Sequence, residues 1–196
     1  MKRLAFLAAI LFLSLTTPAR AGLEEGVAAY KRGDYATAFR EFLPLAQAGD
    51  ASAQSYLSSM YFYGRGVTQD YKEAVRWNRK AAEQGNAGAL YNLGNMYEYG
   101  QGVSQDYKEA VRWYRKAAEK GFASAQYNLG VLNYNGRGVT RDLVQVHMWF
   151  NLAASNYPRR IDSDKAIKGR DLVAKRLSRE QLSRAQRLAR EWRPKP

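Results

Sequence analysis

A 36-residue repeat constrains the fold of this chain more than any other feature of its 196 residues. When residues 53–88 are aligned with residues 89–124, 24 of the 36 positions are identical. Residues 125–160 continue the frame, and residues 23–50 keep part of it. A unit of this length cannot bury an apolar face alone, so successive units must stack. The repeat therefore predicts an elongated array of stacked units.

Each unit is predicted to contain two helices. Residues 89–99 carry Leu93, Met96 and Tyr97 at helical spacing. Residues 106–120 combine an apolar inner side with a charged outer side. The inner side consists of Tyr107, Ala110, Val111, Tyr114, Ala117 and Ala118, and the outer side of Lys108, Glu109, Arg112, Arg115 and Lys116. This pattern predicts an all-α fold built from helix pairs.

Helix boundaries recur in the same frame. An aspartate starts each second helix as an N-cap, namely Asp70, Asp106 and Asp142. Three residues later stand the partners of an expected capping box, Glu73, Glu109 and Gln145. A glycine in left-handed conformation is expected to end the second helices, at Gly49, Gly85 and Gly121, with Asn156 in this role in the third unit. Gly64 and Gly66 are expected to turn the chain between two helices.

The consensus of the repeat resembles that of the Sel1-like repeat family. The pattern A-x-x-x-L-G-x-x-Y-x-x-G-x-G-V-x-x-D-x-x-x-A-x-x-W-x-x-K-A-A-x-x-G runs from Ala89 to Gly121. The resemblance implies an α/α solenoid related to tetratricopeptide repeats. It also implies an adaptor role, in which the protein assembles a complex with other proteins.

The N-terminus has the layout of a secretory signal. A basic start at Lys2 and Arg3 precedes an apolar run over residues 4–15, and Ala19-Arg20-Ala21 follows. The apolar run is shorter than the roughly 20 residues of a membrane-spanning helix. The predicted organisation is a signal peptide, an atypical first helix pair, three repeats and a C-terminal cap, at residues 1–21, 22–52, 53–156 (53–88, 89–124 and 125–156) and 157–196. The expected location is outside the cytoplasm, which is the periplasm in a Gram-negative bacterium.

The third repeat loses the charged stripe of its second helix. Lys108, Arg112 and Lys116 are replaced there by apolar residues, at Val144, Met148 and Leu152. An apolar stripe gains nothing from facing solvent, so another segment should cover it. The tail is the expected cover, with one helix over residues 162–176 and another opened by a capping box at Ser178.

The positive charge is concentrated in this tail. Residues 157–196 contain 13 Lys/Arg and 5 Asp/Glu, a net charge of +8, against +2 for residues 22–156. Arg184, Arg187 and Arg190 follow one helix face. They are either the solvated face of the cap or a contact to an anionic surface, such as envelope lipid or a wall polymer. Aromatic residues do not alternate with the basic ones, so nucleic acid is not an expected partner.

Catalytic and metal-binding chemistry is poorly represented. The chain has no cysteine and one histidine, His147, so neither a zinc site nor a Ser-His pair with a nucleophile elbow is expected. The acidic N-caps would repel phosphate at the glycine turns. The protein is therefore predicted not to be an enzyme and to need no cofactor or metal. An envelope hydrolase is kept as a minor alternative.

The candidate partner-binding residues lie on the free face of the first helices. In repeat proteins of this kind the first helices usually line the concave side. Tyr56, Asn92, Asn95 and Asn128 occupy that face, and the amides of the three asparagines suit the backbone of an extended peptide. The predicted function is an exported adaptor that binds a protein or peptide. The main alternative is attachment to the anionic envelope through the basic tail.

Overall fold

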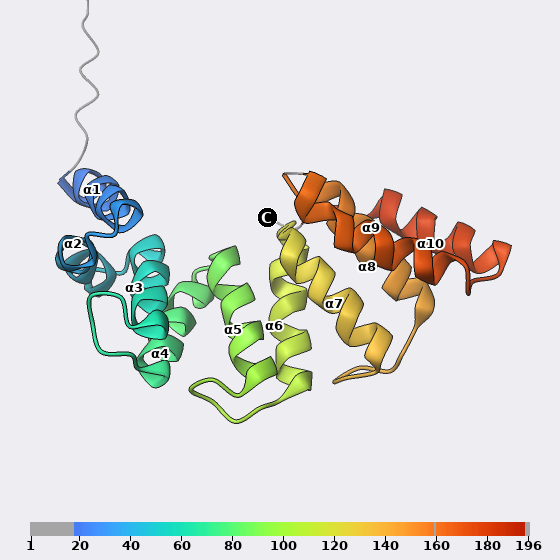
Figure 1. Cartoon of the computed structure of the whole chain (residues 1–196), viewed down its shortest axis with the longest axis horizontal. Helices are drawn as coiled ribbons and strands as arrows, with labels where there is room; N and C mark the ends of the chain where they lie inside the picture. Colours follow the sequence, from blue (N-terminus) through green and yellow to red (C-terminus); the bar gives the residue numbers. More distant parts are fainter. Residues whose placement is uncertain (1–17, 159, 195–196) are drawn as a thin grey trace, which may run out of the picture.

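A computed structural model of the protein describes residues 18–158 and 160–194. These residues form ten α-helices and no strand (Figure 1). The helices are α1 (Pro18–Arg32), α2 (Tyr35–Gln47), α3 (Ala51–Tyr63), α4 (Tyr71–Glu83), α5 (Ala87–Tyr99), α6 (Tyr107–Glu119), α7 (Ala123–Asn135), α8 (Leu143–Asn156), α9 (Arg160–Ala174) and α10 (Arg179–Glu191). The all-α prediction is confirmed.

The helices pack as consecutive antiparallel pairs along an arc. Helices α1 to α9 contact mainly their neighbours in sequence, whereas α10 packs on α8, and α1 and α10 lie toward opposite ends of the arc (Figure 1). The pairs α3–α4, α5–α6 and α7–α8 are the three repeats, and α1–α2 is the atypical first unit. The glycine loops that join first to second helices lie along the lower edge of the view. The predicted α/α solenoid is therefore confirmed.

The aspartate N-caps are present, but the expected capping boxes of the repeats are not reciprocal. Asp106 Oδ1 accepts the backbone N–H groups of Lys108 and Glu109 at 2.8 and 3.1 Å. The Glu109 side chain instead pairs with Arg112 at 2.9 Å. Repeat 53–88 has the same arrangement, with Glu73 paired to Arg76. An arginine three residues farther on offers the carboxylate a charged partner, which competes with the backbone amide.

Glycine ends most helices as expected, and the third repeat is an exception. Gly85 and Gly121 have φ of 79° and 83° after α4 and α6. Asn156 was expected to take this conformation, and that prediction is wrong, because no described residue other than glycine has a positive φ. Asn156 stays helical and donates its amide to Gln126 Oε1 at 3.0 Å. Tyr157, in extended conformation, ends α8 before Pro158.

The repeat tryptophans fill the junctions between units. Trp77 and Trp149 are buried, and Trp113 is partly buried against the largest core cluster. Cationic side chains cover the rings of Trp77 and Trp113, with Arg76 4.3 Å and Lys80 4.8 Å from the Trp77 ring centroid. Large side chains thus form three buried clusters along the solenoid, with Trp77 and Trp149 in two of them.

The tail covers the apolar stripe of α8, as predicted. Val144, Met148 and Leu152 are 7%, 5% and 7% exposed. Helix α10 packs on α8, and its Ala189 joins Met148 and Leu152 in one cluster. A reciprocal capping box between Ser178 and Gln181 starts α10. Residues on α9 pack against the other side of α8, where Val173 contacts the cluster of Val146 and Phe150. The end of the solenoid is therefore closed by two helices.

The predicted signal sequence is largely outside the described residues. Residues 1–17 are not described, and α1 begins at Pro18, before the expected cleavage position after Ala21. Within residues 18–158 and 160–194, no helix is both long enough and apolar enough to cross a membrane.

Candidate functional site

The four residues predicted to contact a partner lie on the first helices of three consecutive repeats. Tyr56 is on α3, Asn92 and Asn95 are on α5, and Asn128 is on α7. All four side chains are half-buried. Their surroundings are of three kinds: a hydrogen-bonded cluster, an aromatic cluster and a cavity.

Asn95 and Asn128 meet at the hydroxyl of Tyr114. The Tyr114 oxygen lies 2.7 Å from Asn95 Oδ1 and 2.6 Å from Glu98 Oε2, and it also hydrogen-bonds to Asn128. Burial raises the pKa of Tyr114 above its ordinary range, and the nearby Glu98 carboxylate adds to this shift. The hydroxyl therefore stays protonated and joins α5, α6 and α7. These two asparagines have a packing role whether or not a partner binds.

Tyr56 belongs to an aromatic cluster between the first two units. Its ring stacks on Phe42 with centroids 4.7 Å apart, and Tyr30 meets it edge-on at 5.4 Å. Arg65 links this cluster to the first glycine loop, because it donates to the Tyr30 hydroxyl at 2.6 Å. Tyr56 therefore joins α1, α2 and α3, and it does not line the cavity beside Asn92.

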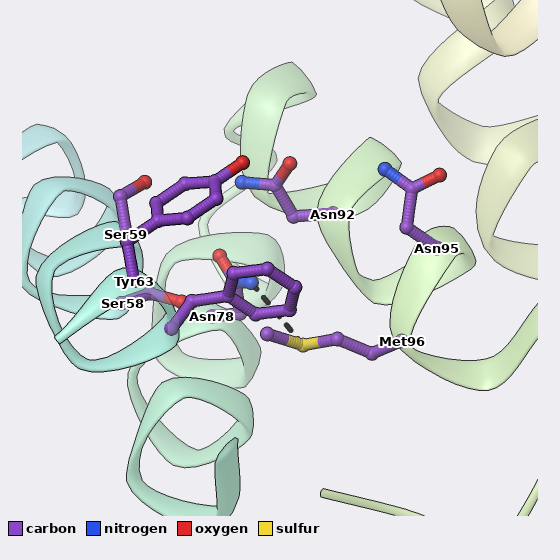
Figure 2. Close-up of a pocket in the computed structure, with 8 residues that line it drawn as sticks. Ser58, Ser59, Tyr63, Asn78, Asn92, Asn95 and Met96 are labelled. Carbon is purple, nitrogen blue, oxygen red and sulfur yellow. Dashed lines mark hydrogen bonds between the residues drawn. The ribbon is translucent and has the colours of Figure 1, made fainter. Parts of the chain in front are cut away.

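Asn92 lines a cavity of about 70 Å³ between α3 and α5. The wall is formed by Ser58, Ser59, Phe62, Tyr63, Asn78, Asn92, Asn95 and Met96. Figure 2 shows Tyr63 and Asn92 facing each other at one side of this space, with Asn78 and Met96 below them. Two of the predicted residues, Asn92 and Asn95, are therefore brought to one cavity, whereas Tyr56 and Asn128 lie outside its wall.

Asn78 is the most deeply buried polar residue of this cavity, and it was not among the residues predicted from the sequence. Asn78 is fully buried on α4 and donates its amide Nδ2 to Met96 Sδ at 3.5 Å. The sequence does mark Asn78 as unusual, because the equivalent positions 36 residues before and after it, Phe42 and Tyr114, are aromatic. An amide at an aromatic position of a packed repeat indicates a local departure from the common core.

The three repeats match the family model described as Sel1 repeat, at residues 51–86, 87–122 and 123–157. These segments make up more than half of the chain. The chain belongs to the Sel1-repeat family. No curated protein sequence matches this Sel1-repeat protein.

Solved structures support the same assignment. A protective antigen of uropathogenic Escherichia coli, described as displaying the Sel1-like repeat fold, is 32% identical, with a TM-score of 0.74 over 88% of this chain. The match spans only 38% of the antigen. A Sel1-repeat protein of Oxalobacter formigenes is 28% identical, with a TM-score of 0.68 over 79% of this chain and 68% of its own. Cysteine-rich protein B of Helicobacter pylori shares the fold at 18% identity, with a TM-score of 0.51 over 78% of this chain and 96% of its own.

The tail arginines of this Sel1-repeat protein lie away from the cavity. Arg184, Arg187 and Arg190 are exposed on α10, whereas Ala185 and Ala189 on the opposite side are buried against α8. The helix thus uses one face for the cap and offers the other to solvent. Whether that basic face binds an anionic surface stays a prediction.

His147 is a buried core residue of α8. It is 3% exposed, and its Nδ1 has no hydrogen-bond partner among the described residues. Burial lowers the pKa of His147, the nearby Arg170 lowers it further, and Asp171 opposes the shift. This environment favours the neutral imidazole and gives the histidine of this Sel1-repeat protein a packing role in the core.

Because His147 is buried in its neutral form, we expect the free energy of unfolding to fall at acidic pH. Because its folded-state pKa lies below the unfolded value of about 6.5, its contribution is fully present above that pH and is lost as pH falls below it. Replacing His147 with Leu should reduce the fall in melting temperature between pH 7 and pH 5. The measurement is the melting temperature of both proteins at several pH values. In a protein of this size, each kcal/mol of stability shifts the melting temperature by about 2–4 °C. Parallel profiles for the two proteins would contradict the prediction.

Proposed function

We propose that this protein is an exported adaptor, which binds a segment of another protein along the face formed by α3 and α5. Sel1 repeats commonly serve in protein–protein interaction rather than in catalysis. The observation that carries the proposal is the cavity between these first helices, with the amides of Asn92 and Asn95 in its wall. Amide side chains suit a peptide, because they donate and accept hydrogen bonds with the peptide backbone.

Export is proposed from the sequence alone. The basic start, the apolar run over residues 4–15 and the Ala19-Arg20-Ala21 motif support it. The cavity and its wall lie entirely C-terminal to residue 21, so removal of a signal would leave the binding face intact. A partner in the cell envelope is consistent with this location.

Replacing Asn92 with Ala should weaken capture of the partner several-fold, because the amide faces the cavity and its loss removes hydrogen bonds at the interface. The measurement is crosslinking in intact cells, followed by purification and quantitative mass spectrometry. A substitution of Asn128 would not test partner binding alone, because it would also remove the hydrogen bond between Asn128 and Tyr114.

The matched control is a variant with Arg184, Arg187 and Arg190 replaced by Ala. These residues are exposed on α10, far along the chain from the cavity. The adaptor proposal requires that this variant capture the partner normally. If instead it loses its cellular contacts, and Asn92→Ala keeps them, attachment through the basic face of α10 replaces the adaptor proposal. The segregation of the three arginines to one exposed face supports that second candidate.

A further inference from the structure

The cavity beside Asn92 arises from one broken position in the repeat. In three of the four units, the second helix places an aromatic ring against a glycine of the first helix. The pairs are Phe42 with Gly26, Tyr114 with Gly94 and Phe150 with Gly130. A Cβ at any of these glycines would overlap the ring. The ring therefore fills the space between the two helices of its unit.

Repeat 53–88 has a different pair at this position. Asn78 replaces the ring, and Ser58 stands where Gly94 and Gly130 stand in the next two repeats. The Ser58 hydroxyl donates to the carbonyl oxygen of Ala74 at 2.8 Å, so it is satisfied inside its own unit. An asparagine is much smaller than the ring it replaces, and a cavity of about 70 Å³ lies at this point. That is several times the space that one water molecule needs.

The Asn78 amide is incompletely paired. Its Nδ2 donates to Met96 Sδ, and this fixes the amide orientation, because a thioether sulfur only accepts hydrogen bonds (Figure 2). Its Oδ1 is buried and accepts no hydrogen bond from the described residues. A buried acceptor without a donor destabilises the folded state. A ligand that brings a donor to this oxygen would remove that cost.

The wall of the cavity restricts the chemistry of such a ligand. The residues that line it are all uncharged. A carboxylate or an ammonium group would lose its hydration there without a counter-charge. Asn95 Oδ1 is already within hydrogen-bond distance of Tyr114, so its Nδ2 is the part of the amide that can donate to a ligand. The cavity thus offers an acceptor at Asn78 and donors at its rim, over an apolar floor that includes Met96.

We propose that this cavity is a subsite for a primary amide, the side chain of a glutamine or asparagine in the bound segment of the partner. A primary amide supplies an N–H for Asn78 Oδ1 and a carbonyl oxygen for the amides of Asn92 and Asn95. It carries no charge, and it has the size of a small side-chain end. This inference rests on the adaptor function proposed above, and it specifies which feature of the partner the face selects.

The test uses propionamide, which has the structure of a glutamine side chain, with the full-length protein labelled at its methionine methyl groups. Propionamide should shift the NMR signal of Met96 in a saturable manner. Met60 and Met148 are internal controls, because neither lines the cavity. Propionate and propylammonium have similar size but carry a charge, and they should leave Met96 unchanged. An equal response to all three compounds would overturn the proposal.

Two variants connect the response to Asn78. Asn78→Leu keeps the approximate size but removes the acceptor, and it should weaken propionamide binding about tenfold or more. The pair Ser58→Gly with Asn78→Phe recreates the Gly130–Phe150 packing of the third repeat and should abolish binding by filling the cavity. Melting temperatures at or above that of the native protein would show that both variants fold. Native affinity in Asn78→Leu would overturn the proposal.

The probe experiment is separate from partner capture, because it contains only the protein and a small molecule. Capture of a partner by a protein that ignores propionamide would reject the amide subsite and leave the adaptor function standing. Selective propionamide binding by a protein that captures no partner would support the amide chemistry of the cavity and reject the adaptor function.

Discussion

A chain that ends at Asn156 is expected to aggregate. Truncation removes α9 and α10 and uncovers the stripe of Val144, Met148 and Leu152, each buried in the whole protein. Burial of three side chains of this size contributes roughly 4–8 kcal/mol. The other side of α8 also loses its cover, since Val173 of α9 packs with Val146 and Phe150. An apolar surface on both sides of a terminal helix favours association between chains.

Size-exclusion chromatography with light scattering measures this effect. The second repeat supplies the matched control, because Lys108, Arg112 and Lys116 occupy the corresponding positions of α6. The truncated chain with Val144→Lys, Met148→Arg and Leu152→Lys should aggregate less than the unchanged truncated chain, since one of its two uncovered apolar surfaces would then be charged. The same three changes in the full-length chain should lower the melting temperature. A monodisperse truncated chain with unchanged melting temperature would refute the role of the cap.

The second large effect is expected at the glycine loops. Gly102 has φ of 75°, and a Cβ there would overlap the backbone carbonyl of Tyr71 in the preceding repeat. Gly66 and Gly138 have the same relation to Tyr35 and Tyr107. Gly102→Ala should therefore combine the strain of a left-handed alanine with a clash against backbone that cannot move aside. The expected loss is about 2–4 kcal/mol of unfolding free energy.

A substitution at Gly33 separates the backbone strain of a left-handed alanine from the clash with the preceding repeat. It has φ of 82°, but nothing lies within 4 Å of a Cβ at that position. Gly33→Ala should cost only about 1 kcal/mol, from backbone strain. Chemical denaturation of the two variants compares them directly. Equal losses would show that the loop does not depend on close contact between repeats.

The helices could be predicted from the sequence because each signal recurs. Apolar spacing, aspartate N-caps and glycine ends occur several times at 36-residue intervals. A misleading residue in one repeat is therefore outweighed by the same pattern in the other repeats. The predictions that failed concern single side chains. The Glu109 carboxylate forms an ion pair with Arg112 and not the expected hydrogen bond to the backbone. Asn156 has a helical conformation and not the expected left-handed one. Both outcomes depend on competition between nearby partners, which the spacing of residues does not describe.

The candidate site was only partly predictable for a related reason. The free face of the first helices was inferred from helical periodicity, and two of the residues inferred in this way, Asn92 and Asn95, line one cavity. Periodicity could not show that Tyr56 stacks on Phe42 or that Asn128 bonds to Tyr114, because these contacts join different units. Asn78 was overlooked because it sits at a core position, where a sequence pattern predicts packing rather than a polar cavity.

The position of α10 on α8 also limits how an array of this kind can lengthen during evolution. A copy of one of these repeats, inserted between repeats 53–88 and 89–124, would contact repeats similar to those that the original contacts. A unit appended after Asn156 would have to displace the cap from the apolar stripe of α8. Duplication of an interior repeat would therefore keep this packing, whereas addition of a unit after Asn156 would break the contact of α10 with α8. The 24 positions that are identical in repeats 53–88 and 89–124 agree with this restriction, because both repeats lie away from the cap.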